Sequence, residues 1–172
     1  IFAEGKQLSA VTVVPPKIAL DTVYFRPNMV NNQEDSLGFV FLRLSDPDTT
    51  GNGYRVYARR NQEPDFYPVE AMTFNDEFVN GLTFDFFTQR SKKPFAKNTF
   101  VKEDFYYQKG DTVYLKFCTM GWEEVDFFRT FEVARNSNGN PFATPMLIKS
   151  NIKGGLGVWY GMAASYDTLI TH

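Results

Sequence analysis

The chain has 172 residues, and 18 Lys and Arg set against 20 Asp and Glu leave a formal net charge of −2. This length suits one domain, and the 43% hydrophobic and 17% aromatic content is typical of globular chains. Acidic and basic residues are interspersed without a basic face, which argues against nucleic acid as a partner. No apolar run approaches the roughly 20 residues of a membrane-spanning helix.

Strand-like patterns dominate the chain. The 18 Phe and 9 Tyr favour strands, because flat rings pack well on a pleated surface. In chain order, apolar and alternating runs predict strands at residues 8–14, 18–26, 37–44, 54–60, 66–74, 82–90, 100–107 and 112–119.

Three of these segments allow more specific predictions. Residues 8–14 end at Pro15 and Pro16, which remove two backbone donors. Residues 37–44 are apolar on both faces, which predicts a central strand. The turn cluster 45–53 predicts that the strands on either side of it form a hairpin with a long loop. Residues 91–98, with their lysines and Pro94, read as an exposed loop.

One segment has helical spacing. From Trp122 to Ala134, apolar residues fall at 122, 125, 128 and 131, with acids near the start and arginines toward the end. This predicts one amphipathic helix over about residues 122–134, lying against an open side of a sheet and covering an edge.

The final segment, residues 151–171, opens with glycines at 154, 155 and 157 and continues through Val158, Trp159 and Tyr160 into strand-like sequence. Glycines in this setting indicate a tight bend or a close backbone approach. We therefore expect a closing strand that completes a sheet. Together, about nine or ten strands and one helix predict a mainly β fold, an antiparallel β-sandwich or partly closed barrel, as a single domain over residues 1–172.

Few residues offer catalytic chemistry. The single histidine, His172, is the last residue, which removes Ser-His-Asp and Cys-His arrangements and clusters of imidazole ligands. The single cysteine, Cys118, allows no internal disulfide, and its alternating neighbours predict a buried, inert thiol. We predict no catalytic residues and no cofactor.

The loop that begins at Asp46 resembles the opening of a calcium-binding loop. Asp46, Asp48 and Thr50 supply oxygens at the first, third and fifth places, and Gly51 is sixth. The twelfth place is Tyr57 rather than Glu, and a hairpin turn explains the same residues. The loop is therefore a weak calcium candidate, and no metal site is predicted.

Clustered carboxylates leave an enzyme as a third alternative. The clusters are Asp76 with Glu77, Glu103 with Asp104, and Glu123 and Glu124 with Asp126. Adjacent acids on a strand point to opposite faces and rarely converge on one bond. An enzyme would need two of Asp76, Glu77, Glu123, Glu124 and Asp126 to face each other across a pocket.

Aromatic residues are the other candidates for a site. Five of them could form a stacking platform for a sugar ring or an apolar ligand: Trp122, Trp159, Tyr160, Tyr106 and Tyr107. The alternative is that they belong to the core, as alternating aromatics in a Phe-rich chain often do.

Several stretches resemble a known family. They are SAVTVVPPKIALDTVYF, LSDPDTTGNGYRVYARR, FNDEFVNGLTFDF, KGDTVYLKFCTMGWEEVDFFRTFEVA, NPFATPMLIKSNIKGGLG and VWYGMAAS. In this order, over about residues 8–170, the chain resembles the C-terminal region of a Bacteroidetes lipoprotein family, domain of unknown function 4249.

That resemblance implies a lipid-anchored outer-membrane protein, on the cell surface or the periplasmic face, encoded beside a TonB-dependent receptor. It implies that a β-sandwich domain precedes this region, so that the chain would be the C-terminal part of a longer lipoprotein. Membrane contact would then come only through a lipid anchor outside this chain. The family has no established catalytic residues.

Two functional hypotheses follow. The first is a non-catalytic accessory domain of a TonB-dependent uptake system that binds a nutrient ligand, such as a glycan or peptide, or the receptor. The second is a structural or protein-interaction module that binds no small ligand. A concave site lined by Trp or Tyr would favour the first, whereas a flat apolar patch would favour protein partners.

Overall fold

The structure is a computed structural model that describes residues 2–3, 5–30, 33–90, 105–137, 144 and 146–172. Its elements are β1 (Phe2–Ala3), β2 (Lys6–Gln7), β3 (Thr22–Val30), β4 (Gln33–Ser45), β5 (Gly53–Arg60), β6 (Tyr67–Asn75), β7 (Thr83–Thr88), β8 (Tyr107–Gln108), β9 (Thr112–Met120), α1 (Trp122–Ser137) and β10 (Ala163–Ile170).

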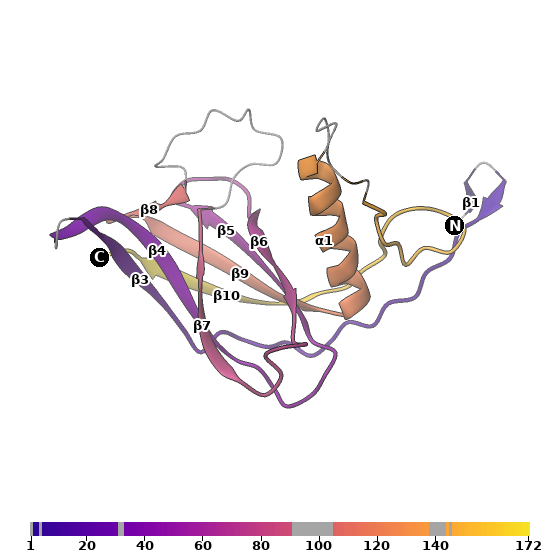
Figure 1. The fold of residues 1–172 in the computed structure, drawn as a ribbon, viewed down its shortest axis with the longest axis horizontal. Coiled ribbons are helices and arrows are strands. Elements are labelled where there is room, and N and C mark those ends of the chain that lie inside the picture. Colours follow the sequence, from indigo (N-terminus) through magenta and orange to yellow (C-terminus); the bar gives the residue numbers. More distant parts are fainter. Residues whose placement is uncertain (1, 4, 31–32, 91–104, 138–143, 145) are drawn as a thin grey trace.

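Two antiparallel sheets form the body of the molecule (Figure 1). One has the order β10-β9-β5-β6, and the other has the order β3-β4-β7 with β8 also paired to β4. The two strands β1 and β2 pair separately at the far end of the N-terminal segment. The predicted antiparallel β-sandwich is confirmed, and in the described part of the chain the sheets do not close into a barrel.

Most predicted strands are present, with shifted ends. The segment 37–44 lies within β4, which has a partner on each side as a central strand should. The segment 112–119 becomes β9, between β10 and β5. The strand predicted at 18–26 begins only at Thr22. Residues 100–104, and the loop predicted at 91–98, lie outside the described residues.

Two predictions about strand organisation are wrong. Residues 8–14 form no strand apart from a single bridge between Ser9 and Lys153, because no further neighbour pairs with their backbone. The strands flanking residues 45–53 do not form a hairpin, since β4 and β5 belong to different sheets. The turn residues carry the chain from one layer of the sandwich to the other.

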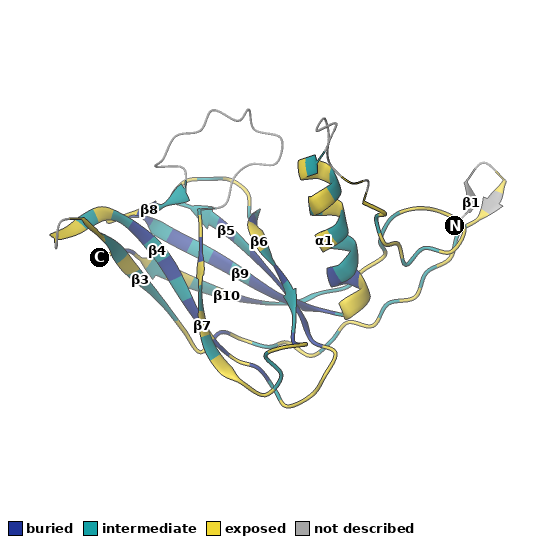
Figure 2. Ribbon diagram, in the orientation of Figure 1, coloured by how far each residue is buried: buried dark blue, intermediate teal, exposed yellow. Residues whose placement is uncertain are grey.

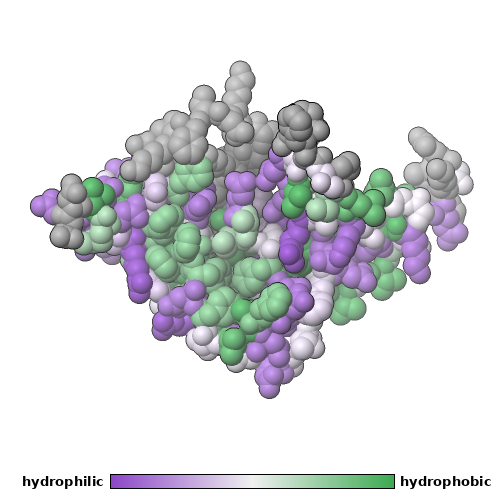
Figure 3. Space-filling model, viewed as in Figure 1, coloured by the Kyte–Doolittle hydropathy of each residue, from purple (hydrophilic) through white to green (hydrophobic). Residues whose placement is uncertain are grey.

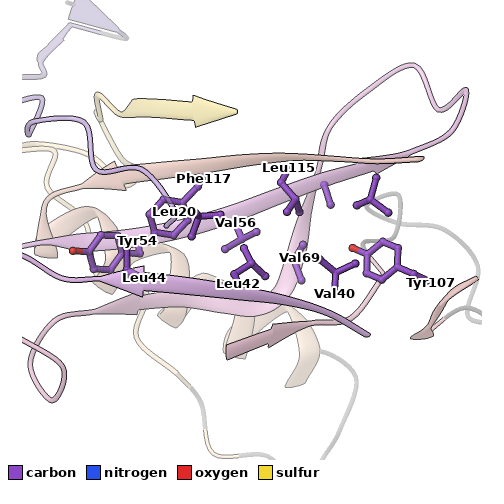
Figure 4. Packing of buried hydrophobic residues seen from close by; sticks show 12 residues of the cluster. Leu20, Val40, Leu42, Leu44, Tyr54, Val56, Val69, Tyr107, Leu115 and Phe117 are labelled. Carbon is purple, nitrogen blue, oxygen red and sulfur yellow. The ribbon is translucent and has the colours of Figure 1, made fainter. Parts of the chain in front are cut away.

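The core lies between the two sheets and is built from the inward positions of alternating strands (Figure 4). Val40, Leu42 and Leu44 of β4 face Val56 of β5 and Leu115 of β9, all fully buried. Figure 2 shows this burial concentrated along the middle of both sheets. Leu20, which precedes β3, and Tyr107 of β8 also belong to the cluster.

The helix forms a third layer. The prediction of a helix over 122–134 is confirmed, and α1 continues for three more residues to Ser137. Val125 and Phe128 pack against Cys118 and Met120 on the outer side of the β10-β9-β5-β6 sheet, near its edge strand β6. The predicted burial of Cys118 is confirmed, and this burial raises the pKa of its thiol.

The closing strand is confirmed but is shorter than expected. Only Ala163–Ile170 forms β10, an edge strand paired to β9, whereas Trp159 and Tyr160 precede it. The glycine run makes the expected close approach. Gly154 has a φ of +85°, and a Cβ there would lie 2.7 Å from the carbonyl oxygen of Gln7. The segment before β10 therefore packs against the N-terminal segment.

Candidate functional site

The five candidate aromatic residues lie in three different places. Tyr107 is 1% exposed, in the core. Tyr106 lies on the opposite side of the same strand segment, against Phe39. The other three lie near α1: Trp122 begins the helix, Tyr160 contacts Phe128, and Trp159 is exposed and bound through its backbone to Asn151. They therefore do not build one platform.

A different set of aromatic rings does come together, on the outer side of the β3-β4-β7 sheet. The cross-strand register places Tyr24 opposite Phe41, and Phe41 opposite Phe87. Phe39 lies next along β4 on the same side, because side chains of a strand alternate. We call this set the aromatic face; it comprises Tyr24, Phe39, Phe41, Phe87 and Tyr106.

The rings of the aromatic face form a continuous layer. Ring centroids are 5.4 Å apart for Tyr24 and Phe41, and 5.8 Å apart for Phe41 and Phe87. Phe39 lies 4.9 Å from Phe87 and 5.0 Å from Tyr106. Phe87 is 44% exposed, and Figure 3 shows apolar side chains gathered over β4 and β7 on this side of the molecule. Phe87 is thus accessible to a partner, and the other four rings of the face are half-buried.

Charged groups surround these rings. The guanidinium of Arg26 lies 5.1 Å from the Tyr24 ring and 5.0 Å from the Phe41 ring. Arg43 donates two hydrogen bonds to Asp85, at 2.7 and 2.9 Å, and the Tyr24 hydroxyl donates a third at 3.0 Å. The hydrogen bond from Arg43 is the main reason why the pKa of Asp85 is lowered.

A signal for the aromatic face exists in the sequence. Residues 37–44 are apolar on both sides, which predicts a strand covered on both faces. The inner side of β4 does face the core, but within the described chain no layer covers its outer side. A strand that is apolar on both sides and covered on one indicates a missing partner.

In the loop that is the weak calcium candidate, the first carboxylate already accepts hydrogen bonds from other groups of the protein. The carboxylate of Asp46 accepts hydrogen bonds from the Tyr54 hydroxyl and, at 3.1 Å, from the Gly81 amide. Asp48 and Thr50 are exposed. Among the described residues, no group of three or more His, Cys, Asp or Glu is placed to hold a metal ion. The hydrogen bond to Gly81 joins the β4–β5 connection to the β6–β7 connection.

The candidate carboxylates have separate partners. Asp76 is fully buried and accepts hydrogen bonds from Asn52 and Trp122. Glu124 accepts one from Thr12. Glu77 is exposed, and Glu103 and Asp104 lie outside the described residues.

Glu123 and Asp126 do line one hollow, of about 670 Å³. Both come from the first turns of α1, three positions apart, so they lie on one wall instead of facing each other. Asp126 is also 2.5 Å from Nζ of Lys149. This geometry offers no pair of acids across a scissile bond.

Comparisons with protein-family models, curated proteins and solved structures give no match. The described residues contain no helix long and apolar enough to cross a membrane. The described residues therefore define a class only: an antiparallel β-sandwich with one covering helix and an aromatic face that no described segment covers.

Proposed function

We propose that this chain is a non-catalytic accessory domain of a TonB-dependent outer-membrane uptake system, and that its aromatic face binds the receptor. The aromatic face carries this proposal. An antiparallel sheet commonly presents polar side chains to water on the side away from the core, whereas this sheet presents five neighbouring rings.

The composition of the face favours a protein partner. Aromatic residues and arginine are enriched at the centres of protein interfaces, and lysine is depleted there. The face combines its five rings with Arg26 and Arg43. Complete burial of one Phe side chain contributes about 1.5 to 3 kcal/mol. Several partly exposed rings can therefore contribute substantially to binding.

The cellular location and the receptor partner are proposed from the family resemblance. It supports a lipid-anchored protein of the bacterial outer membrane whose gene adjoins that of a receptor, with the anchor outside this chain. The alternative is a structural module that uses the same face to pack against another protein domain. The Arg43–Asp85 pair, already satisfied within the sheet, suits such a fixed packing surface.

Site-specific photo-crosslinking in the native outer membrane tests the proposal. A photo-reactive amino acid at position 87 should form an adduct with the receptor encoded beside the gene. The matched control is position 156, where Leu156 is 87% exposed in the glycine-rich segment. Equal adducts at both positions, or adducts at 87 only with another domain of the same polypeptide, would contradict receptor binding.

A binding measurement adds a second test. Replacing Phe39 and Phe87 by Ser should weaken binding of the purified protein to the purified receptor at least tenfold, since tenfold corresponds to about 1.4 kcal/mol. Leu156→Ser, at an exposed position outside both sheets, is the control. Unchanged affinity in the Phe variant, with its fold intact by circular dichroism, would refute the assignment of the face.

A further inference from the structure

The outer side of the β10-β9-β5-β6 sheet carries a second ordered set of side chains. The register places Tyr57, Lys116 and Tyr166 side by side on β5, β9 and β10. In the next row, Arg59 lies opposite Tyr114. Cations and tyrosines thus alternate both along and across the strands. With Phe66, these residues form what we call the cation–tyrosine face.

Short contacts hold this arrangement together. The guanidinium of Arg59 lies 3.9 Å from the Tyr114 ring and 5.5 Å from the Phe66 ring. Nζ of Lys116 lies 5.3 Å from the Tyr57 ring. Phe66 meets Tyr166 edge-on at 6.0 Å. Tyr166 is 64% exposed, whereas the other members of the face are half-buried.

Among the described residues, the two cations of the face have no carboxylate partner. Within the described residues, neither Arg59 nor Lys116 forms a salt bridge, and the guanidinium of Arg59 donates only to the carbonyl of Glu63, at 3.2 Å. The next cation toward α1, Arg55, is instead neutralised by Glu132 at 2.9 Å.

On β9 and β10, the neighbouring side chains of this face carry no negative charge. Cys118, Ala164 and Thr168 lie on the same side of the strands and are uncharged, whereas Asp167 points to the other side. The carboxylate of Glu63 accepts a hydrogen bond from the Arg60 amide. A local positive charge on a chain of net charge −2 attracts anions to this place.

We propose that the cation–tyrosine face binds an acidic sugar chain. The exposed Tyr166 ring provides a flat apolar surface for the C–H face of a pyranose ring. Arginine binds carboxylate or sulfate through two parallel hydrogen bonds, and lysine supplies a point charge. Alternating cations and rings match a polymer that alternates charge and apolar surface.

Two other ligand classes fit less well. Nucleic acid binding draws its strength from many phosphate contacts, and this face offers two cations. A protein interface would place lysine at its rim, whereas Lys116 lies on the middle strand of the face. The face lies on the opposite side of the sandwich from the aromatic face, so its ligand and the receptor would occupy separate surfaces.

Calorimetric titration of the 172-residue chain tests this inference. The probes are oligogalacturonate, which is carboxylated, chondroitin sulfate, which is also sulfated, and dextran, which is neutral. We expect binding to at least one acidic probe, weaker binding at higher salt and none to dextran. The stronger of the two acidic probes identifies the preferred anionic group.

Variants locate the site. Lys116→Gln, Arg59→Gln and Tyr166→Ser should each weaken binding about tenfold or more, equivalent to about 1.4 kcal/mol. Lys153→Gln removes an exposed lysine elsewhere and should leave affinity unchanged. Circular dichroism and the melting temperature report whether each variant folds.

Four outcomes would overturn the proposal: no binding to either acidic probe, equal binding to dextran, unchanged affinity in folded Lys116→Gln, or equally tight binding of single-stranded DNA. None of these concerns the receptor. Conversely, loss of receptor crosslinking at position 87 would leave the sugar-binding inference standing.

Discussion

The indole Nε1 of Trp122 lies 2.9 Å from Oδ1 of Asp76, and this hydrogen bond joins the start of α1 to the connection between β6 and β7. Asp76 also accepts hydrogen bonds from the Asn52 amide at 2.9 Å and from the Asn52 side chain at 3.1 Å. A fourth donor, the Gly51 amide, lies at 3.4 Å. The buried carboxylate thus joins the helix and two interstrand connections.

Asp76→Asn should lower the free energy of unfolding by about 2 to 3 kcal/mol. The amide loses one acceptor and turns its own N–H groups toward the donors of Asn52 and Trp122, so that buried groups remain unsatisfied. Urea unfolding measures the loss. Asp48→Asn, at an exposed acid of the adjoining loop, is the control and should change stability by less than about 0.5 kcal/mol. Equal losses in the two variants would refute this role.

Glu132→Gln should destabilise the fold by about 3 kcal/mol, because it leaves the guanidinium of Arg55 buried without its counter-charge. Arg55 is 5% exposed, pairs with Glu132 at 2.9 Å and stacks 4.0 Å from the Phe128 ring. The double variant Arg55→Met with Glu132→Leu should recover most of the lost stability, since an apolar pair avoids desolvating two charges. Chemical unfolding of all three proteins checks this, and a double variant less stable than Glu132→Gln would contradict it.

The fold should weaken in alkali between about pH 10 and pH 12. Burial raises the pKa of Tyr107 from 10.0 to about 12, so the unfolded chain loses this proton first as the pH rises. The stabilising contribution is complete below pH 10 and disappears above about pH 12. Two pKa units correspond to about 2 to 3 kcal/mol.

Tyr107→Phe isolates this contribution. The variant loses the hydrogen bond to the Gln89 carbonyl, which costs about 1 kcal/mol near neutral pH, and its stability should then fall less steeply above pH 10. Urea unfolding at several pH values gives both slopes. Parallel curves for the two proteins would show that Tyr107 does not cause the alkaline loss.

Millimolar calcium should change the melting temperature by less than about 1 °C, because a ligand stabilises only by binding the folded state. Both carboxylate oxygens of Asp46 already accept hydrogen bonds, from Tyr54 and Gly81. Calorimetry with and without a chelator measures the effect. Asp46→Asn should destabilise the protein equally in both conditions, and a stabilisation by calcium that this variant abolishes would restore the loop as a metal site.

Local sequence patterns gave correct predictions for elements whose secondary structure depends on the spacing of their own side chains. The apolar spacing from Trp122 to Ala134 predicted α1, and alternation over residues 112–119 predicted β9, since side-chain period follows backbone geometry. The prediction of a hairpin around residues 45–53 was wrong. Turn residues indicate that the chain changes direction, but they do not indicate which strand the next strand pairs with.

The candidate site residues show the same difference between what a local sequence pattern predicts and what strand pairing decides. Tyr106 and Tyr107 are neighbours in the sequence, yet one lies on the aromatic face and the other in the core. Tyr57, Lys116 and Tyr166 are far apart in the sequence and share one row. No local pattern could group these three, because strand order and register bring them together.

The sequence by itself determined the β-rich class, the helix α1, the buried thiol of Cys118 and the glycine contact near the closing strand, because each depends on residue type and spacing over a short stretch. Only the tertiary structure decided which sheet each strand joins and which aromatic residues lie outside. Those outcomes depend on pairing between distant segments, and pairing places one set of rings in the core and leaves another beside charged groups at the surface.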